Sequence, residues 1–359
     1  IKNIAVNKTF SSDIYGDVGG ANINIISKEL SGDQNLEIGV STGVNTQTLD
    51  KNFLTMDGGN YFGTVDKNPN ISNLSNYSFK NNLNPNTQSL QTNTSFGASG
   101  GKKFNIGDNT LSMFLVATQG NSYRFREGTI RQTTSVGTVF HDMEVQKYTY
   151  NVAQTFMGNF KYKFGSFNTI SFNSLYIHSN TQSVGDYFGM NDPQETGDLE
   201  FLRRQQMNDN NLWVNQLLST LKLTEKVNLD LGASYSMIRT SEPDRRSNSY
   251  LLRNGAYRPS TDSAGDHERY FADLDENDYA GKAVATYKLS EEKDSKLDIG
   301  YNFRYTTRDF ASTIFNHRFS TMQEVDPNNA DALFNQNSID SGIFDLQTGR
   351  GTMSNPRVF

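Results

Sequence analysis

The sequence contains no cysteine and is poor in several other residue types that mark particular protein classes. Its 359 residues include a single tryptophan, Trp213, and seven prolines, and the longest uninterrupted apolar run is Met113–Ala117. The absence of cysteine excludes disulfides and thiolate metal sites. A run this short is far below the roughly 20 apolar residues that a transmembrane helix needs. These absences exclude a disulfide-stapled domain and a membrane protein built from helices.

Basic clusters and catalytic motifs are also missing. The formal net charge is −6, and no cluster of Lys and Arg of the kind that binds phosphates is present, so we expect no nucleic-acid partner. The four histidines are scattered and form no H-E-x-x-H motif; they are His141, His178, His267 and His317. We therefore expect no catalytic residues and no cofactor.

Two acidic groups admit two interpretations. One contains Asp273, Asp275, Glu276 and Asp278, and the other lies at 141–144. Oxygen ligands of this kind can bind a hard cation, but acidic residues in connections are more often simply solvated. Neither group has the spacing of an EF-hand, so we predict no metal site.

Apolar and polar residues alternate over long stretches. In residues 297–306, Leu297, Ile299 and Tyr301 belong to one set, and the residues between them are polar or glycine. A period of two places the two sets on opposite faces of a strand, whereas a helix would mix them. Nine such strands are predicted, at about 35–49, 89–100, 110–119, 148–164, 169–179, 212–223, 227–239, 279–289 and 296–309.

The connections between these strands alternate between short and long. The long ones are 50–88, 120–147, 180–211 and 240–278, followed by the tail 310–359. All seven prolines fall in these segments, as expected if the strands are paired, because proline removes a ladder hydrogen bond.

A meander with every long loop at one end is typical of outer-membrane β-barrels, which have short periplasmic turns and longer extracellular loops. We therefore predict an all-β fold, a transmembrane antiparallel up-and-down β-barrel. A soluble sandwich, barrel or propeller is the alternative, although such folds usually have shorter strands and loops of similar length at both ends.

The beginning of the chain resembles a known family. The stretch 4–28, IAVNKTFSSDIYGDVGGANINIISK, is similar to the end of the plug domain of TonB-dependent outer-membrane receptors. The match is carried by Ser11, Ser12, Tyr15, Gly16, Gly19, Gly20, Ile23, Asn24, Ile25, Ser27 and Lys28. Residues 55–69, TMDGGNYFGTVDKNP, resemble a pattern that follows the first barrel strand in receptors of the Bacteroidota.

The resemblance implies a domain organisation. Residues 1–30 would be the C-terminal end of the plug, and residues 31–359 the N-terminal part of the barrel, with the long connections on the extracellular side. Barrels of this family have about 22 strands around a plugged lumen, so about nine strands here imply a fragment.

The resemblance also implies a function. This is energy-coupled uptake of a scarce ligand, such as a siderophore, metal chelate, peptide or glycan, across the outer membrane of a Gram-negative bacterium. The implied partners are outer-membrane lipid, the TonB complex through a segment not contained in this sequence, and a surface lipoprotein or other envelope subunit. The alternative is a receptor-like barrel that serves as a structural or partner subunit without transport. A soluble surface adhesin is a third interpretation.

Aromatic residues fall into two groups. Those near strand ends, such as Trp213, Tyr279 and Tyr287, suit the interfacial girdles of a barrel. A second group lies in the predicted loops and would either pack the loops together or line a surface for a ligand or partner. Its members are Tyr61, Phe62, Tyr187, Phe188, Tyr250, Tyr257, Tyr270 and Phe271.

Overall fold

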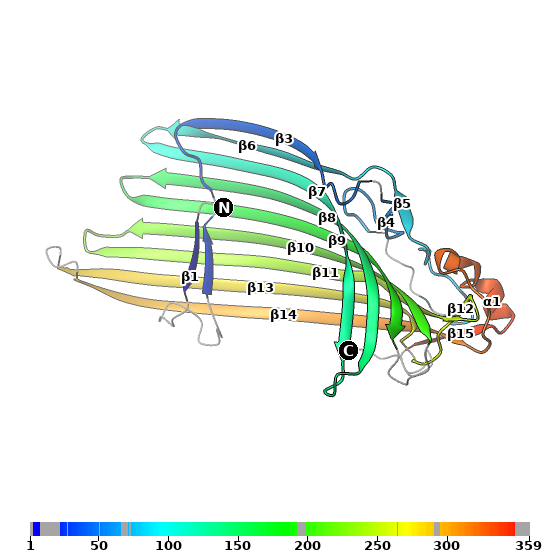
Figure 1. The fold of residues 1–359 in the computed structure, drawn as a ribbon. Helices are drawn as coiled ribbons and strands as arrows, with labels where there is room; N and C mark the ends of the chain where they lie inside the picture. The colour runs from blue at the N-terminus through cyan, green and yellow to red at the C-terminus, as the bar shows by residue number, and fades with distance from the viewer. Residues whose placement is uncertain are drawn as a thin grey trace.

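The protein is built almost entirely from antiparallel strands. The structure, a computed structural model, describes residues 3–7, 22–26, 28–49, 51–65, 71, 73–191, 198–263, 265–290 and 295–348. Strands account for 72% of these residues and helices for 4%. Most strands belong to one sheet with the order β15-β14-β13-β11-β10-β9-β8-β7-β6-β3, and β12 pairs with β11 beside this path. Figure 1 shows tight hairpin turns at one end of this sheet and β4, β5, β12, β15 and α1 gathered at the other.

The strands of the main sheet are long. Their bounds are β3 Gln34–Val44, β6 Thr92–Ile106, β7 Asn109–Thr133, β8 Val139–Phe164, β9 Asn168–Asn191, β10 Leu199–Lys222, β11 Val227–Arg253, β12 Ala256–Pro259, β13 His267–Ser290, β14 Ser295–Phe319 and β15 Phe344–Thr348. Two small hairpins stand apart, β1 (Asn3–Asn7) with β2 (Asn22–Ile26) and β4 (Phe53–Thr55) with β5 (Asn86–Gln88). A short 3₁₀ helix at Pro327–Ala332 and helix α1 at Gln336–Asp340 precede β15.

The predicted all-β, up-and-down antiparallel fold is confirmed, and each of the nine predicted strands has a counterpart in the sheet. The prediction placed these strands in the wall of a larger barrel and did not expect them to close by themselves. Among the described residues the sheet is open. β3 forms one edge, and β15, which pairs with β14, forms the other. At the turn end, Gly107 and Gly165 adopt positive φ angles of 59° and 58°, which allow tight turns between the strands.

The predicted long loops are in large part strand. β7 and β8 occupy most of 120–147, β9 and β10 extend well into 180–211, and β11 and β13 do the same in 240–278. In these outer halves the residues on both faces are largely polar, so the alternation that marks a strand in the sequence disappears. The hydrogen-bonded ladders nevertheless continue almost unbroken.

Cross-strand pairing shows which residues share a face, because directly opposed residues in antiparallel strands point to the same side. One such row crosses three strands through Leu231, Ala283 and Tyr301. The row two residues closer to the outer end contains Ala233, Gly281 and Phe303. The apolar sets predicted on separate strands therefore form one continuous face.

β11 contains one extra residue relative to both neighbours. Against β10, Ser241 and Arg246 pair with Asp209 and Gln205, so five steps in β11 match four in its partner. The pairing with β13 shifts at the same place, between Glu242 and Arg245. This β-bulge inverts the alternation, so even-numbered residues after it share the face that odd-numbered residues occupied before it.

Candidate functional site

The apolar face remains uncovered in the half of the sheet nearest the tight turns. Its large side chains are exposed, with Tyr301, for example, 72% exposed. We call this surface the apolar band. Its exposed members are Leu36, Ile38, Val40, Phe96, Phe104, Leu115, Phe156, Ile170, Phe172, Trp213, Leu217, Leu231, Tyr279, Tyr287, Leu297, Ile299, Tyr301, Phe303 and Tyr305. A contiguous apolar surface crossing nine strands is far larger than the scattered exposed residues of soluble proteins.

The apolar band ends abruptly toward the outer half of the sheet. There, on the same face, a single row of opposed residues is polar on seven consecutive strands. We call it the polar row, and it consists of Gln119, Gln154, His178, Asn211, Arg239, Asp275 and Asp309. The change from Phe156 to Gln154 on β8 and from Trp213 to Asn211 on β10 takes one step along the face.

The opposite face of the same strands carries charge. Asp278 accepts hydrogen bonds from Arg304 and Thr306 at 2.5 and 2.7 Å. Lys161, on this face, pairs with Glu29 at 3.1 Å between Nζ and Oε2. Glu29 follows β2, so the segment that leaves the N-terminal hairpin contacts the polar face and not the apolar band.

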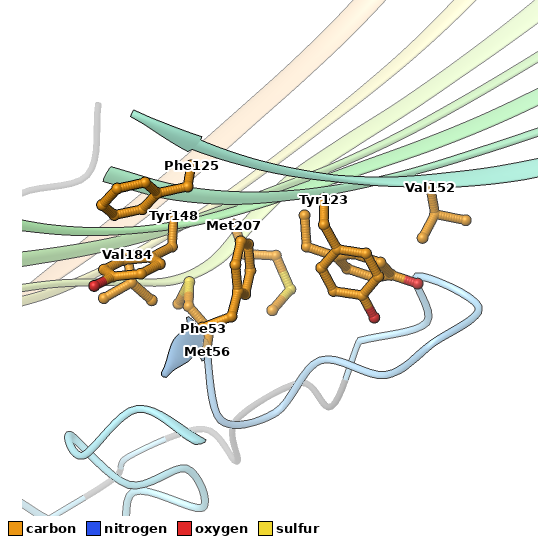
Figure 2. Packing of buried hydrophobic residues seen from close by; sticks show 9 residues of the cluster. Phe53, Met56, Tyr123, Phe125, Tyr148, Val152, Val184 and Met207 are labelled. Atoms are coloured by element: carbon orange, nitrogen blue, oxygen red, sulfur yellow. The ribbon is translucent and has the colours of Figure 1, made fainter. Parts of the chain in front are cut away.

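In the outer half of the sheet, the apolar band's face is covered by residues 51–65 and 73–90, which we call the docked segment. Phe53 and Met56 insert among strand residues, as Figure 2 shows. The Phe53 ring makes edge contacts with Tyr123 and Tyr148 at centroid distances of 5.2 and 5.4 Å. Such edge-to-face pairs add to the stabilisation from apolar burial.

The turn around residues 59–63 rests on the polar row. The Tyr150 hydroxyl donates to the Tyr61 carbonyl at 2.6 Å, and Gln154 Nε2 donates to the Phe62 carbonyl at 3.4 Å. His178 is buried beside this turn. Its Nε2 atom lies 2.7 Å from Asp209 Oδ1, and its Nδ1 atom lies 3.2 Å from Gln154 Oε1. The backbone of the turn is therefore fixed to the sheet by side chains from β8.

A buried ionic cluster holds the remainder of the docked segment. Asp244 accepts from Arg246 Nε at 2.9 Å and from Arg269 Nε at 3.0 Å, and all three side chains are almost fully buried. The same guanidiniums donate to carbonyl oxygens of the docked segment, Arg246 to Asp57 at 2.8 Å and Arg269 to Asn81 at 2.9 Å. Burial opposes ionisation of Asp244, but Arg269 and Arg246 together outweigh it and lower the pKa of its carboxyl.

Residues 320–343 complete the cover. Asp331 accepts from the backbone N–H groups of Leu83 and Asn84 at 2.8 and 2.9 Å. Phe334 packs against His267 and His317 with ring centroids 5.5 and 4.9 Å away. Burial lowers the pKa of both imidazoles to about 3, so both are neutral at physiological pH.

The predicted loop aromatics separate into three environments. Tyr250 is 1% exposed and belongs to a core cluster against which Tyr257 packs. Phe271 stacks on Phe79 of the docked segment, whereas Tyr270 lies next to it in β13 and carries Arg245 over its ring. Tyr187 and Phe188 are partly buried neighbours in β9. These six are therefore strand residues and not loop residues.

Of the predicted loop aromatics, Tyr61 and Phe62 alone lie in a loop, and both rings are exposed. In the predicted plug motif, Ser11, Ser12, Tyr15, Gly16, Gly19 and Gly20 lie outside the described residues, as does Ser27. Ile23, Asn24 and Ile25 form part of β2, which pairs with β1. The bond between the ionic cluster and the docked segment has no local signal in the sequence, because Arg246 and Asp57 are 189 residues apart.

The acidic groups do not form a cation site in the part of the chain that the structure describes. Alternation along β13 places Asp273 and Asp275 on one face and Glu276 and Asp278 on the other. No group of three or more His, Asp or Glu residues suited to a metal ion occurs among the described residues. Within that same part, no helix has the length and apolar character needed to cross a membrane.

Comparison with known proteins gives no identification: no family model, no curated protein and no solved structure matches the chain.

Proposed function

We propose that this chain forms part of the wall of an outer-membrane β-barrel of the TonB-dependent receptor kind, which takes up a scarce ligand. The observation that carries the proposal is the apolar band. On β14 its exposed side chains run from Leu297 to Tyr305, nine residues, and a transmembrane strand tilted by about 45° needs about 9–11. An outward apolar face backed by a polar inner face is the pattern of such barrels.

An open sheet cannot remain in lipid, because its edge N–H and C=O groups would have no partners there. The proposal therefore requires further strands to pair with β3 and with the length of β14 that β15 leaves uncovered. β15 reaches only Phe315–Phe319 of β14. The receptor assignment rests on the sequence resemblance and is supported by the Glu29–Lys161 contact, since a plug enters the barrel on its polar face.

The absence of cysteine from these 359 residues helps a direct test of the wall. Single cysteines at Ile299, Tyr301 and Phe303 would be labelled with an environment-sensitive fluorophore in the full polypeptide, reconstituted in phosphatidylcholine vesicles. We expect blue-shifted emission and quenching by brominated lipid at these positions. Matched labels at Asn302 and Thr306 on the opposite face should resist lipid quenching. Equal quenching at odd and even positions, or none at all, would contradict the membrane wall.

The uptake role needs a separate experiment. Deletion of the gene should slow growth in a medium limited for iron, for peptide nitrogen or for glycan carbon, and only while TonB is present. Equal growth of deleted and parent strains in all three media would contradict uptake while leaving the membrane wall intact. That outcome is expected for a partner subunit without transport.

A further inference from the structure

The turn at residues 59–63 differs from the rest of the docked segment in what it exposes. Phe53 and Met56, a few residues earlier, are completely buried. Tyr61 is 45% exposed and Phe62 is 54% exposed, and their rings contact each other edge to face at a centroid distance of 5.2 Å. Two adjacent large aromatic side chains are thus presented to the surroundings by a turn whose backbone is fixed.

The place of this turn on the sheet is defined by its contacts. Gln154, which holds the Phe62 carbonyl, belongs to the polar row and is one step outward from Phe156 of the apolar band. The Tyr61 hydroxyl lies 2.5 Å from the Thr94 hydroxyl, and Thr94 on β6 is likewise one step beyond Phe96 of the band. The aromatic pair therefore sits on the border of the apolar band, on the same face.

We propose that Tyr61 and Phe62 form an interfacial lipid anchor that rests in the headgroup region of the outer leaflet. This inference rests on the proposed membrane wall. The border of the apolar band is the level at which hydrocarbon gives way to headgroups, and amphipathic aromatic rings favour that level because one edge is apolar and the other is hydrated. A lipid surface is the occupant because the pair is continuous with the surface that faces lipid.

The anchor lies where the strands' own residues are polar. On β7, β8 and β9 the polar row presents Gln119, Gln154 and His178 at this level. The turn lies against this polar stretch, and Tyr150 and Gln154 donate hydrogen bonds to its backbone carbonyls. A backbone fixed before membrane insertion loses little conformational entropy when its side chains enter the interface.

Depth-dependent quenching tests the anchor. Fluorophore-labelled Phe62→Cys, Tyr301→Cys and Val136→Cys variants of the full polypeptide would be reconstituted in phosphatidylcholine vesicles. The lipids would carry bromine either close to the headgroup or deep in the acyl chain. Tyr301 marks the apolar band, whereas Val136, 86% exposed in the β7–β8 connection, marks the aqueous end.

We expect the label at residue 62 to be quenched at least twofold more by the shallow bromine than by the deep one. The label at residue 301 should be quenched more by the deep bromine, and that at residue 136 by neither. Quenching at residue 301 without quenching at residue 62 would overturn the anchor and leave the membrane wall standing. No quenching at either residue would overturn both. Shielding of residue 62 from iodide in cells but not in vesicles would indicate a protein partner and also overturn the lipid anchor.

Discussion

Replacing Asp244 with alanine should release the docked segment from the outer half of the sheet. The substitution leaves Arg246 and Arg269 buried without the carboxylate that joins them. Breaking a buried ion pair by removing one partner costs about 3–5 kcal/mol. Since about 1.4 kcal/mol corresponds to a tenfold change in an equilibrium constant, local opening should increase about 100-fold to 4,000-fold.

Hydrogen exchange of the full polypeptide in detergent micelles can measure this change. The amide protons of Leu83 and Asn84 are suitable reporters because both are bonded to Asp331 in the docked state. The matched control is Asp142→Ala, which removes a 2.8 Å pair with Arg131 that is largely exposed and should cost at most about 1 kcal/mol. If exchange at Leu83 and Asn84 were the same in both variants, the ionic cluster would not hold the segment.

Three further outcomes follow from the structure. Phe53→Ala should destabilise the packing of the docked segment by about 3–5 kcal/mol, seen as faster protease cleavage within residues 51–65; unchanged cleavage would contradict its core role. Tyr301→Lys should lower barrel stability by about 2–4 kcal/mol in denaturant titrations in vesicles, whereas Asn302→Lys should change it by about 0.5 kcal/mol or less; equal effects would argue against a lipid-facing band. The unfolded form protonates His267 and His317 below their ordinary pKa of 6.5, but the folded form does so only near pH 3, so stability should fall as pH drops from 6.5 toward 3. At pH 5 each imidazole should lower stability by about 2 kcal/mol relative to pH 8. A variant with glutamine at both positions should flatten this dependence in exchange measurements, and an unchanged profile would refute the assignment.

Sequence alternation located the inner half of each strand and missed the outer half for a physical reason. Alternation appears only where one face meets an apolar environment and the other a polar one. On β9, Ile170 and Phe172 satisfy this condition, but Asn180 and Gln182 lie on the same face beneath the docked segment. Their buried polar groups form hydrogen bonds, such as that from Gln182 to Asn180 at 3.2 Å. Because these residues are polar, the sequence does not indicate that this face is buried.

The contacts that hold the docked segment could not be predicted from local sequence. Nothing in the local sequence distinguishes Arg246, Arg269 and Asp331 from surface residues. The partner of each on the docked segment is more than 150 positions away. The sequence groups Tyr61 and Phe62 with six other aromatic residues of the predicted loops and does not distinguish these two. Their level relative to the apolar band could be known only from the Gln154 and Thr94 contacts.

The extra residue in β11 divides that strand into two reading frames. If one residue between Glu242 and Arg245 were deleted, four steps in β11 would match four in β10, and Arg246 would stay opposite Gln205 on the face that binds the docked segment. A single deletion elsewhere in the outer half of β11, where the strand has no extra residue, would instead shift the register and invert every side chain beyond it. Related sequences should therefore be aligned separately before and after this position, because a one-residue gap there leaves the residues beyond it on the same face.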